Sequence, residues 1–154
     1  MNIPKPYTLL VVDPQVDFVS GSLAVPHAAE AMEQLTEWGN LHIEDMEALI
    51  ITSDQHTWNH CSFKAYGGVW PPHCIRHTIG AALTPELIPL IEQVIVRGIP
   101  YQMVEKATTA EQDAYSAFEK ELPPLLQKAT HIVVAGIAGA VSYTHLTLPT
   151  KRIV

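Results

Sequence analysis

The chain has 154 residues, of which 47% are hydrophobic and 16% are charged, and it carries a formal net charge of −7. This length and composition are typical of one compact globular domain and exclude an intrinsically disordered chain. The negative charge argues against nucleic acid or an anionic membrane as a partner. Two cysteines, no signal-like amino terminus and no apolar run of about 18 residues fit a cytoplasmic protein with reduced thiols.

Apolar runs and helical spacings alternate along the first part of the chain. Continuous apolar runs predict strands at Thr8 to Val12 and at Ala48 to Thr52, the first of them buried on both faces. Apolar residues at helical spacing predict a helix over 28–38. Thr84, followed by a first-turn proline and an acid, predicts the start of a second helix, which ends at Gly98.

The same alternation continues after this second helix. Tyr101 to Glu105 is a predicted third strand, and Ile132 to Ala135 is a predicted fourth. Between them, Asp113 can cap a short helix over 114–118, and the Pro123-Pro124 pair interrupts whatever helix follows. The pattern predicts an α/β fold, a three-layer sandwich with a mainly parallel central sheet that stops after about the fourth strand.

Residues able to do chemistry follow each predicted strand. Asp13 follows the first strand, Asp54 and His56 the second, Lys106 the third, and a turn at Gly136 the fourth. Ligands of parallel sheets bind outside the carboxyl ends of the strands. We therefore expect these four strand ends to meet at one pocket, with Asp13 and Lys106 within ion-pair reach.

The stretch from Thr52 to His77 is dense in groups that bind metals. It holds four of the eight histidines, both cysteines and two of the three tryptophans. Asp54 and His56 leave one strand face, and His60 and His73 follow. Imidazoles with a carboxylate suit zinc, manganese or iron(II), so we predict one divalent metal ion in preference to a fortuitous polar loop.

The two cysteines are Cys61 and Cys74, each beside a histidine. They form no C-x-x-C pair, and their spacing does not fit a zinc finger. We expect both to be small buried packing residues.

These motifs resemble the nicotinamidases of the isochorismatase-like cysteine hydrolases. The resemblance covers roughly residues 7–138, and the metal motif and WPPHC are its specific part. It is carried by VVDPQVDF at 11–18, SLAV at 22–25, SDQHTWNHCSF at 53–63, WPPHC at 70–74, EK at 105–106, DAYSAF at 113–118 and VAGIA at 134–138.

The resemblance implies a Rossmann-like fold and hydrolysis of nicotinamide to nicotinate and ammonia, a step of NAD salvage. It implies that Asp13 is the general base and Lys106 the lysine of an Asp-Lys-Cys triad. Amide hydrolysis needs a nucleophile, a base and oxyanion donors, and a nearby lysine keeps a carboxylate ionised and favours a thiolate.

The resemblance also implies a metal and a substrate pocket. The implied metal ligands are Asp54, His56 and His73, and His60 matches the further histidine that some members of the family direct at the metal. Its substrate-binding residues are Phe18, Trp70, Tyr115 and Ala138, although plain packing explains Tyr115 nearly as well. Gln15 could orient the pocket by hydrogen bonding. The expected partner is a small amide, with a homo-oligomer left open.

The chain departs from the family's pattern in two places. Ala107 stands where many members have glycine, a change expected to alter loop freedom only. By count, Ser142 stands where the family has its catalytic cysteine, and no cysteine follows Cys74. We expect residues 1–138 to be an incomplete hydrolase domain. Residues 141–154 lack helical periodicity and resemble translated sequencing adaptor, so we expect a carboxyl-truncated copy with a non-native tail at 139–154 and no turnover.

Two other readings stay open at this point. The chain could be a related hydrolase that acts on a carbamoyl or enol-ether substrate, although members acting on isochorismate do not resemble this metal motif. It could also be a catalytically silent metal-binding or regulatory protein, which the absent cysteine favours.

Overall fold

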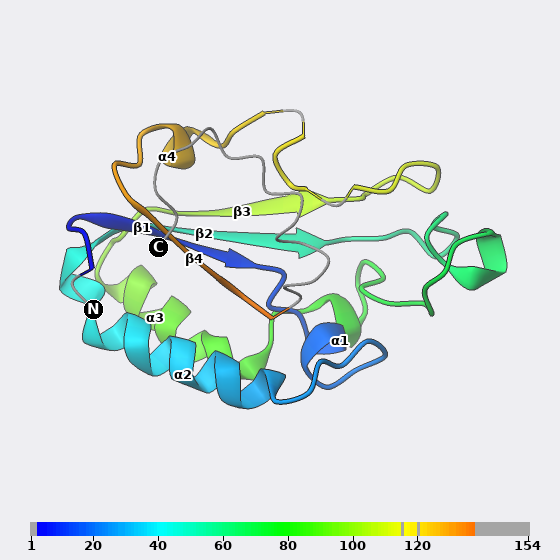
Figure 1. The fold of residues 1–154 in the computed structure, drawn as a ribbon, viewed down its shortest axis with the longest axis horizontal. Helices are drawn as coiled ribbons and strands as arrows, with labels where there is room; N and C mark the ends of the chain where they lie inside the picture. Colours follow the sequence, from blue (N-terminus) through cyan, green and yellow to red (C-terminus); the bar gives the residue numbers. More distant parts are fainter. Residues whose placement is uncertain (1–2, 115, 120, 138–154) are drawn as a thin grey trace.

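A parallel sheet lies at the centre of the computed structural model, which describes residues 3–114, 116–119 and 121–137 (Figure 1). Within these residues the sheet has four strands in the order β3-β2-β1-β4, and every neighbouring pair is parallel. The strands are β1 (Tyr7–Val12), β2 (Met46–Asp54), β3 (Tyr101–Lys106) and β4 (Ile132–Gly136). The four predicted strands are therefore confirmed, and each extends by one to four residues beyond its predicted range.

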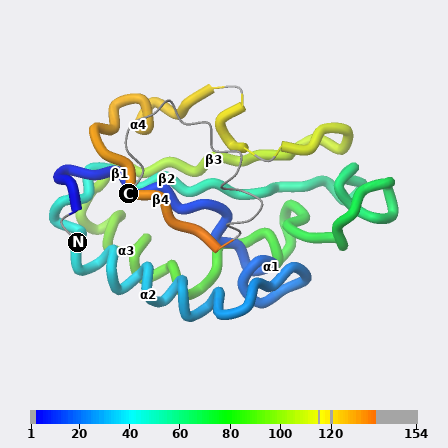
Figure 2. The backbone as a smooth tube through the Cα atoms, in the orientation of Figure 1, coloured from blue at the N-terminus to red at the C-terminus, as the bar shows by residue number. Residues whose placement is uncertain are grey.

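Helices cover both faces of this sheet. Figures 1 and 2 show α2 and α3 side by side along one face and α4 over the other. The α-helices are α1 (Val16–Val19), α2 (Ala28–Leu41), α3 (Ile88–Val96) and α4 (Pro124–Gln127). Short 3₁₀ turns are η1 (Ile43–Asp45), η2 (Lys64–Tyr66), η3 (Ile79–Ala81) and η4 (Pro85–Leu87). The three-layer α/β sandwich predicted from the alternating pattern is confirmed.

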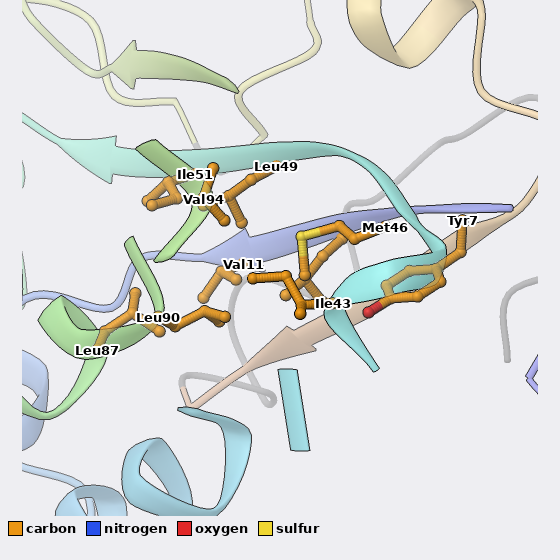
Figure 3. Packing of buried hydrophobic residues seen from close by; sticks show 10 residues of the cluster. Tyr7, Val11, Ile43, Met46, Leu49, Ile51, Leu87, Leu90 and Val94 are labelled. Carbon is orange, nitrogen blue, oxygen red and sulfur yellow. The ribbon is translucent and has the colours of Figure 1, made fainter. Parts of the chain in front are cut away.

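The first strand is buried along its whole length, and its side chains alternate between two cores. Leu9 and Val11 join the core that α3 covers, where Leu87, Leu90 and Val94 pack against β1 and β2 (Figure 3). Leu10 and Val12 face the opposite core under α4. This period of two explains why a continuous apolar run forms the central strand of a covered parallel sheet.

Two local predictions after β3 are wrong. The described residues from 113 to 119 are irregular apart from a turn at 117–118, and they do not form the short helix predicted over 114–118. Asp113 Oδ1 accepts a hydrogen bond from Ala114 N, and Ser116 Oγ accepts one from Phe118 N. These side-chain bonds compete with the backbone hydrogen bonds of a helix. The proline pair starts a helix instead of interrupting one, because Pro124 stands at the first position of α4.

The expected tail at 139–154 lies outside the described residues. Among the residues that the structure does describe, no helix is both long enough and apolar enough to cross a membrane.

Candidate active site

An ion-paired lysine joins three strand ends at the carboxyl edge of the sheet. Asp54 and Lys106 are register partners at the ends of β2 and β3, and Asp13 follows β1. Lys106 Nζ lies 2.6 Å from Asp54 Oδ1 and 3.1 Å from Asp13 Oδ2. The expected ion-pair reach between Asp13 and Lys106 is therefore present, and the lysine also pairs with Asp54.

All three charged groups are buried, so their electrostatic effects on one another are large. Burial lowers the pKa of Lys106, but the carboxylates of Asp13 and Asp54 outweigh burial and raise it above its ordinary value. Burial raises the pKa of Asp54 to about 7 although Lys106 opposes the shift. The lysine thus stays protonated at neutral pH and can donate hydrogen bonds to both acids.

Thr52 holds both the side chain and the backbone of Asp13. Thr52 Oγ1 donates to Asp13 Oδ1 over 2.7 Å, and Asp13 N donates to the carbonyl oxygen of Thr52 over 3.1 Å. The backbone of Asp13 has a φ of 50°, a left-handed conformation that aspartate tolerates better than most residues. No sequence motif marks Thr52, which is recognisable only as the end of a predicted strand.

Three possible metal ligands gather beside this ion pair. One ligand atom from each of Asp54, His56 and His73 lies within 4.8 Å of the other two, and all three residues are buried. The Nε2 atoms of His56 and His73 are 3.2 Å apart, and Asp54 Oδ2 lies 3.7 Å from His56 Nε2. Two nitrogens bound to one tetrahedral zinc ion at ordinary distances are about 3.3 Å apart, so the spacing fits a shared cation.

The second ring nitrogens of the two histidines settle their tautomers. His56 Nδ1 lies 3.1 Å from the carbonyl oxygen of Ala107, and His73 Nδ1 lies 2.8 Å from that of Pro71. A carbonyl only accepts hydrogen bonds, so both Nδ1 atoms carry the proton and both Nε2 atoms carry lone pairs. Two lone pairs that face each other have no hydrogen to share, and a cation between them satisfies both.

Both imidazoles are neutral at physiological pH. Burial, and then the neighbouring His60, lowers the pKa of His56 to about 3. Burial also lowers the pKa of His73. Because a histidine must be neutral to bind a metal, the two side chains need not lose a proton on binding.

His60 lies next to this group but does not join it. Its ring centroid is 4.0 Å from that of His56. His60 Nδ1 accepts from Ser62 N at 3.2 Å, so Nε2 carries the proton and donates to the carbonyl oxygen of Gln112 at 3.2 Å. Both ring nitrogens are used by protein partners, and His60 supports the ring of His56 by stacking.

Ala107 contacts a candidate ligand through its backbone. Its φ is 51°, in the left-handed region that favours glycine. The side chain is buried, and the carbonyl of the same residue accepts the proton of His56. The expectation that alanine at this position alters only loop freedom stays a prediction, and the structure adds that Ala107 holds a strained conformation whose carbonyl positions a candidate ligand.

Two of the predicted substrate residues, Phe18 and Trp70, belong to the described part of the chain. Phe18 is buried, and its ring centroid is 5.8 Å from that of His73. Trp70 is half-buried, and its backbone forms a parallel bridge with Phe63. Tyr115, Ala138 and Ser142 lie outside the described residues.

Phe63 is a site residue that we missed. It is 1% exposed, and its ring centroid is 5.5 to 5.7 Å from those of three histidines, His56, His60 and His73. The signal was its place in the SDQHTWNHCSF motif, two residues after Cys61. Its ring gives the histidine cluster an apolar floor, which helps to keep the imidazoles neutral.

The two cysteines differ in their surroundings. Cys74 is fully buried beside Phe18 and Ala81, and burial raises the pKa of its thiol well above the ordinary value. Cys61 is only half-buried, so the expectation of a buried packing residue is confirmed for Cys74 and wrong for Cys61. The thiol of Cys74 is therefore a packing group and a poor nucleophile.

Comparisons with known proteins agree with this fold. The chain is 29% identical to the nicotinamidase of Saccharomyces cerevisiae over 137 residues, and 32% identical to that of Escherichia coli over 132 residues. These alignments cover 72% and 73% of this chain and 61% and 57% of the two relatives, so the chain spans less than two thirds of their length. No family model matches the chain.

Solved structures show the same relationship. The pyrazinamidase of Pyrococcus horikoshii in complex with zinc has a TM-score of 0.68 and 30% identity over 86% of this chain and 71% of that one. The yeast nicotinamidase bound to the inhibitor nicotinaldehyde has a TM-score of 0.73 and 25% identity, covering 88% of this chain and 77% of that one. The chain belongs to the nicotinamidases of the isochorismatase-like hydrolases.

Proposed function

We propose that this site binds one divalent metal ion through Asp54, His56 and His73 and is built for hydrolysis of nicotinamide to nicotinate and ammonia. One observation carries the proposal: Lys106 pairs with Asp13 and with Asp54, so the proposed acid-base group and the proposed metal ligand share one buried lysine. The relatives named as nicotinamidases support the substrate, and the zinc complex of the pyrazinamidase supports the metal.

The protein's own residues have separable roles in this proposal. A bound divalent ion supplies a Lewis acid that can hold the ring nitrogen of a pyridine substrate or a water. Asp13 takes the proton of the nucleophile and later delivers it to the leaving ammonia. Lys106 pairs with Asp13 at 3.1 Å and stabilises negative charge beside it.

Aromatic side chains complete the proposed substrate pocket. Phe18, already packed near His73, contacts one face of the pyridine ring, and Trp70 contacts it from the WPPHC loop. Tyr115 and Ala138 are proposed substrate contacts from the resemblance alone.

We further propose that the 154-residue chain binds nicotinamide without hydrolysing it. Its only two cysteines are Cys61 and Cys74, and neither belongs to the part of the sequence where the family has its nucleophile. Ser142 has that place by count, but a serine hydroxyl does not form an anion as easily as a thiol does beside an Asp-Lys pair. The chain therefore retains the base, the lysine and the metal ligands without the thiolate.

Ammonia release and ligand binding by the zinc-loaded chain test both proposals together. We expect calorimetry to detect nicotinamide binding that Asp54→Ala abolishes, and ammonia release equal to that of buffer. Asp45→Asn, which removes a surface carboxylate paired with Lys5, is the matched control and should bind like the wild type. Ammonia release that disappears in Ser142→Ala would show a serine nucleophile and contradict the silent chain. Failure to bind nicotinamide would contradict the substrate.

A further inference from the structure

Asp17, on the short helix α1, contacts the loop that carries His73. Asp17 Oδ2 accepts a hydrogen bond of 2.7 Å from the backbone N of Cys74, the residue that follows His73. Asp17 Oδ1 accepts a second, of 3.3 Å, from Ser22 N. The carboxylate therefore ties the WPPHC loop to α1 across 57 residues of sequence.

Cys74 is a point where the loop needs such a tie. Its φ is 47°, a left-handed conformation that costs free energy for a residue with a side chain. Its carbonyl oxygen accepts from His56 N at 2.9 Å, and its own N donates to Asp17. Both backbone polar groups of Cys74 are thus held, one by a candidate ligand and one by Asp17, and these contacts fix His73 relative to His56.

Two glycines make the space that the Asp17 carboxylate occupies. A Cβ atom added at Gly80 would collide with Asp17 Oδ2, and one added at Gly21 would collide with Asp17 Oδ1. A side chain at either glycine would therefore have to displace the carboxylate, each of whose oxygens already has an amide partner. An ordinary surface aspartate has no such fitted cradle.

The segment that carries Asp17 also contacts Asp54, the carboxylate of the candidate metal site. Gln15, fully buried, accepts from Asp54 N at 2.8 Å and donates to the carbonyl oxygen of Asp54 at 2.7 Å. Gln15 thus fixes the backbone of Asp54, and Asp17, two residues later, fixes the residue next to His73. One short segment after β1 sets the separation between the two arms of the candidate metal site.

We propose that Asp17 is a positioning residue for the metal centre, acting through the backbone of Cys74 to hold His73 at the spacing that one metal ion requires. This inference rests on the proposed metal site. Residues outside the ligand shell that orient a ligand change metal affinity by about 10- to 100-fold when they are removed. We expect an effect of that size from Asp17.

The test compares Asp17→Ala, Asp17→Asn and Gly80→Ala in the 154-residue chain, with Asp45→Asn as the charge-matched control. Zinc affinity is measured by competition with a chelating dye, and the visible absorption of the cobalt(II) form reports the ligand geometry. We expect Asp17→Ala to lose about 10- to 100-fold in affinity and to shift the cobalt spectrum. Gly80→Ala should do the same, because it displaces a carboxylate that is still present.

Asp17→Asn should retain most of the affinity, since its amide oxygen can still accept the hydrogen bond from Cys74 N. If Asp17→Ala does not fold, Asp17→Asn and Gly80→Ala decide the question. Unchanged affinity and cobalt spectra in a folded Asp17→Ala or Gly80→Ala protein, even with a lower melting temperature, would overturn this inference alone. A wild-type chain that binds neither zinc nor cobalt would overturn the metal site and this inference with it.

Discussion

Lys106 Nζ lies 2.6 Å from Asp54 Oδ1, and this contact ties the proposed metal ligand Asp54 to the lysine that also pairs with the proposed general base, Asp13. The same nitrogen lies 3.1 Å from Asp13 Oδ2. The lysine therefore uses one oxygen of Asp54, Oδ1. The other oxygen, Oδ2, lies 3.7 Å from His56 Nε2 and is the one available to a metal ion.

Replacement of Lys106 by methionine should destabilise the protein strongly. The variant leaves two buried carboxylates facing each other without a cation, which typically costs about 3–5 kcal/mol. We expect urea unfolding to show a loss of that order. Asp13→Asn combined with Lys106→Met should cost less than the sum of the two single changes, because the groups are in contact. Strict additivity would show that the three side chains are not coupled as described.

Replacement of Ala107 by glycine should stabilise the protein. The residue has a φ of 51°, where glycine avoids the strain of a Cβ atom, and the expected gain is up to about 1 kcal/mol. Ala31→Gly in the exposed part of α2 is the matched control and should cost about 1 kcal/mol. Equal losses in the two variants, measured by chemical unfolding, would show that Ala107 is not strained.

Tyr7 should make the protein sensitive to alkaline pH. Burial, with a smaller contribution from Asp45, raises the pKa of Tyr7 from 10.0 to about 12. The folded state therefore prefers the protonated phenol, so its stabilising contribution is complete below pH 10 and is lost as the pH rises towards 12. The loss amounts to about 2–3 kcal/mol.

Tyr7→Phe should remove this part of the pH dependence, at a constant cost of about 1 kcal/mol for the hydrogen bond to the carbonyl of His42. Unfolding free energies of the two proteins at several pH values between 9 and 12 provide the check. Parallel curves would show that the pKa of Tyr7 is the same in the folded and unfolded states, against the shift described here.

The two cysteines should react with thiol reagents at different rates. Cys61 is half-buried, whereas Cys74 is fully buried with its thiol pKa raised by burial. We expect a disulfide reagent to label Cys61 in the native protein and to reach Cys74 only after unfolding. Cys61→Ser should abolish native labelling. Fast native labelling of this variant would place Cys74 in a more open environment than the structure gives it.

Sequence patterns predicted the sheet and the meeting of its strand ends, because burial in a parallel sheet requires continuous apolar runs. Asp13 and Lys106 could be placed together since parallel strands end at the same edge. The non-helical backbone around Asp113 and Ser116 could not be predicted. Short side chains that bond to nearby backbone amides compete with helix formation without changing the hydrophobic pattern of the sequence.

The supporting residues of the site were also beyond sequence patterns. Asp17 acts on Cys74, and the contact depends on a left-handed backbone and on space beside Gly80. His60 matches a ligand by sequence, yet its tautomer is set by hydrogen bonds to Ser62 and Gln112, which only the folded chain brings near. Hydrophobic periodicity predicts which face of a strand or helix a side chain lies on. It does not predict which ring nitrogen of a histidine has a hydrogen-bond partner.

Zinc titration of the metal-free chain tests the central claim most directly. The Nε2 atoms of His56 and His73 lie 3.2 Å apart with both Nδ1 protons used by carbonyls, which is the arrangement expected around one shared cation. We expect one equivalent of zinc to bind, and His73→Ala and His56→Ala each to lose most of the affinity, while His60→Ala keeps the stoichiometry of one. Full zinc content in both the His56→Ala and the His73→Ala proteins would contradict the claim.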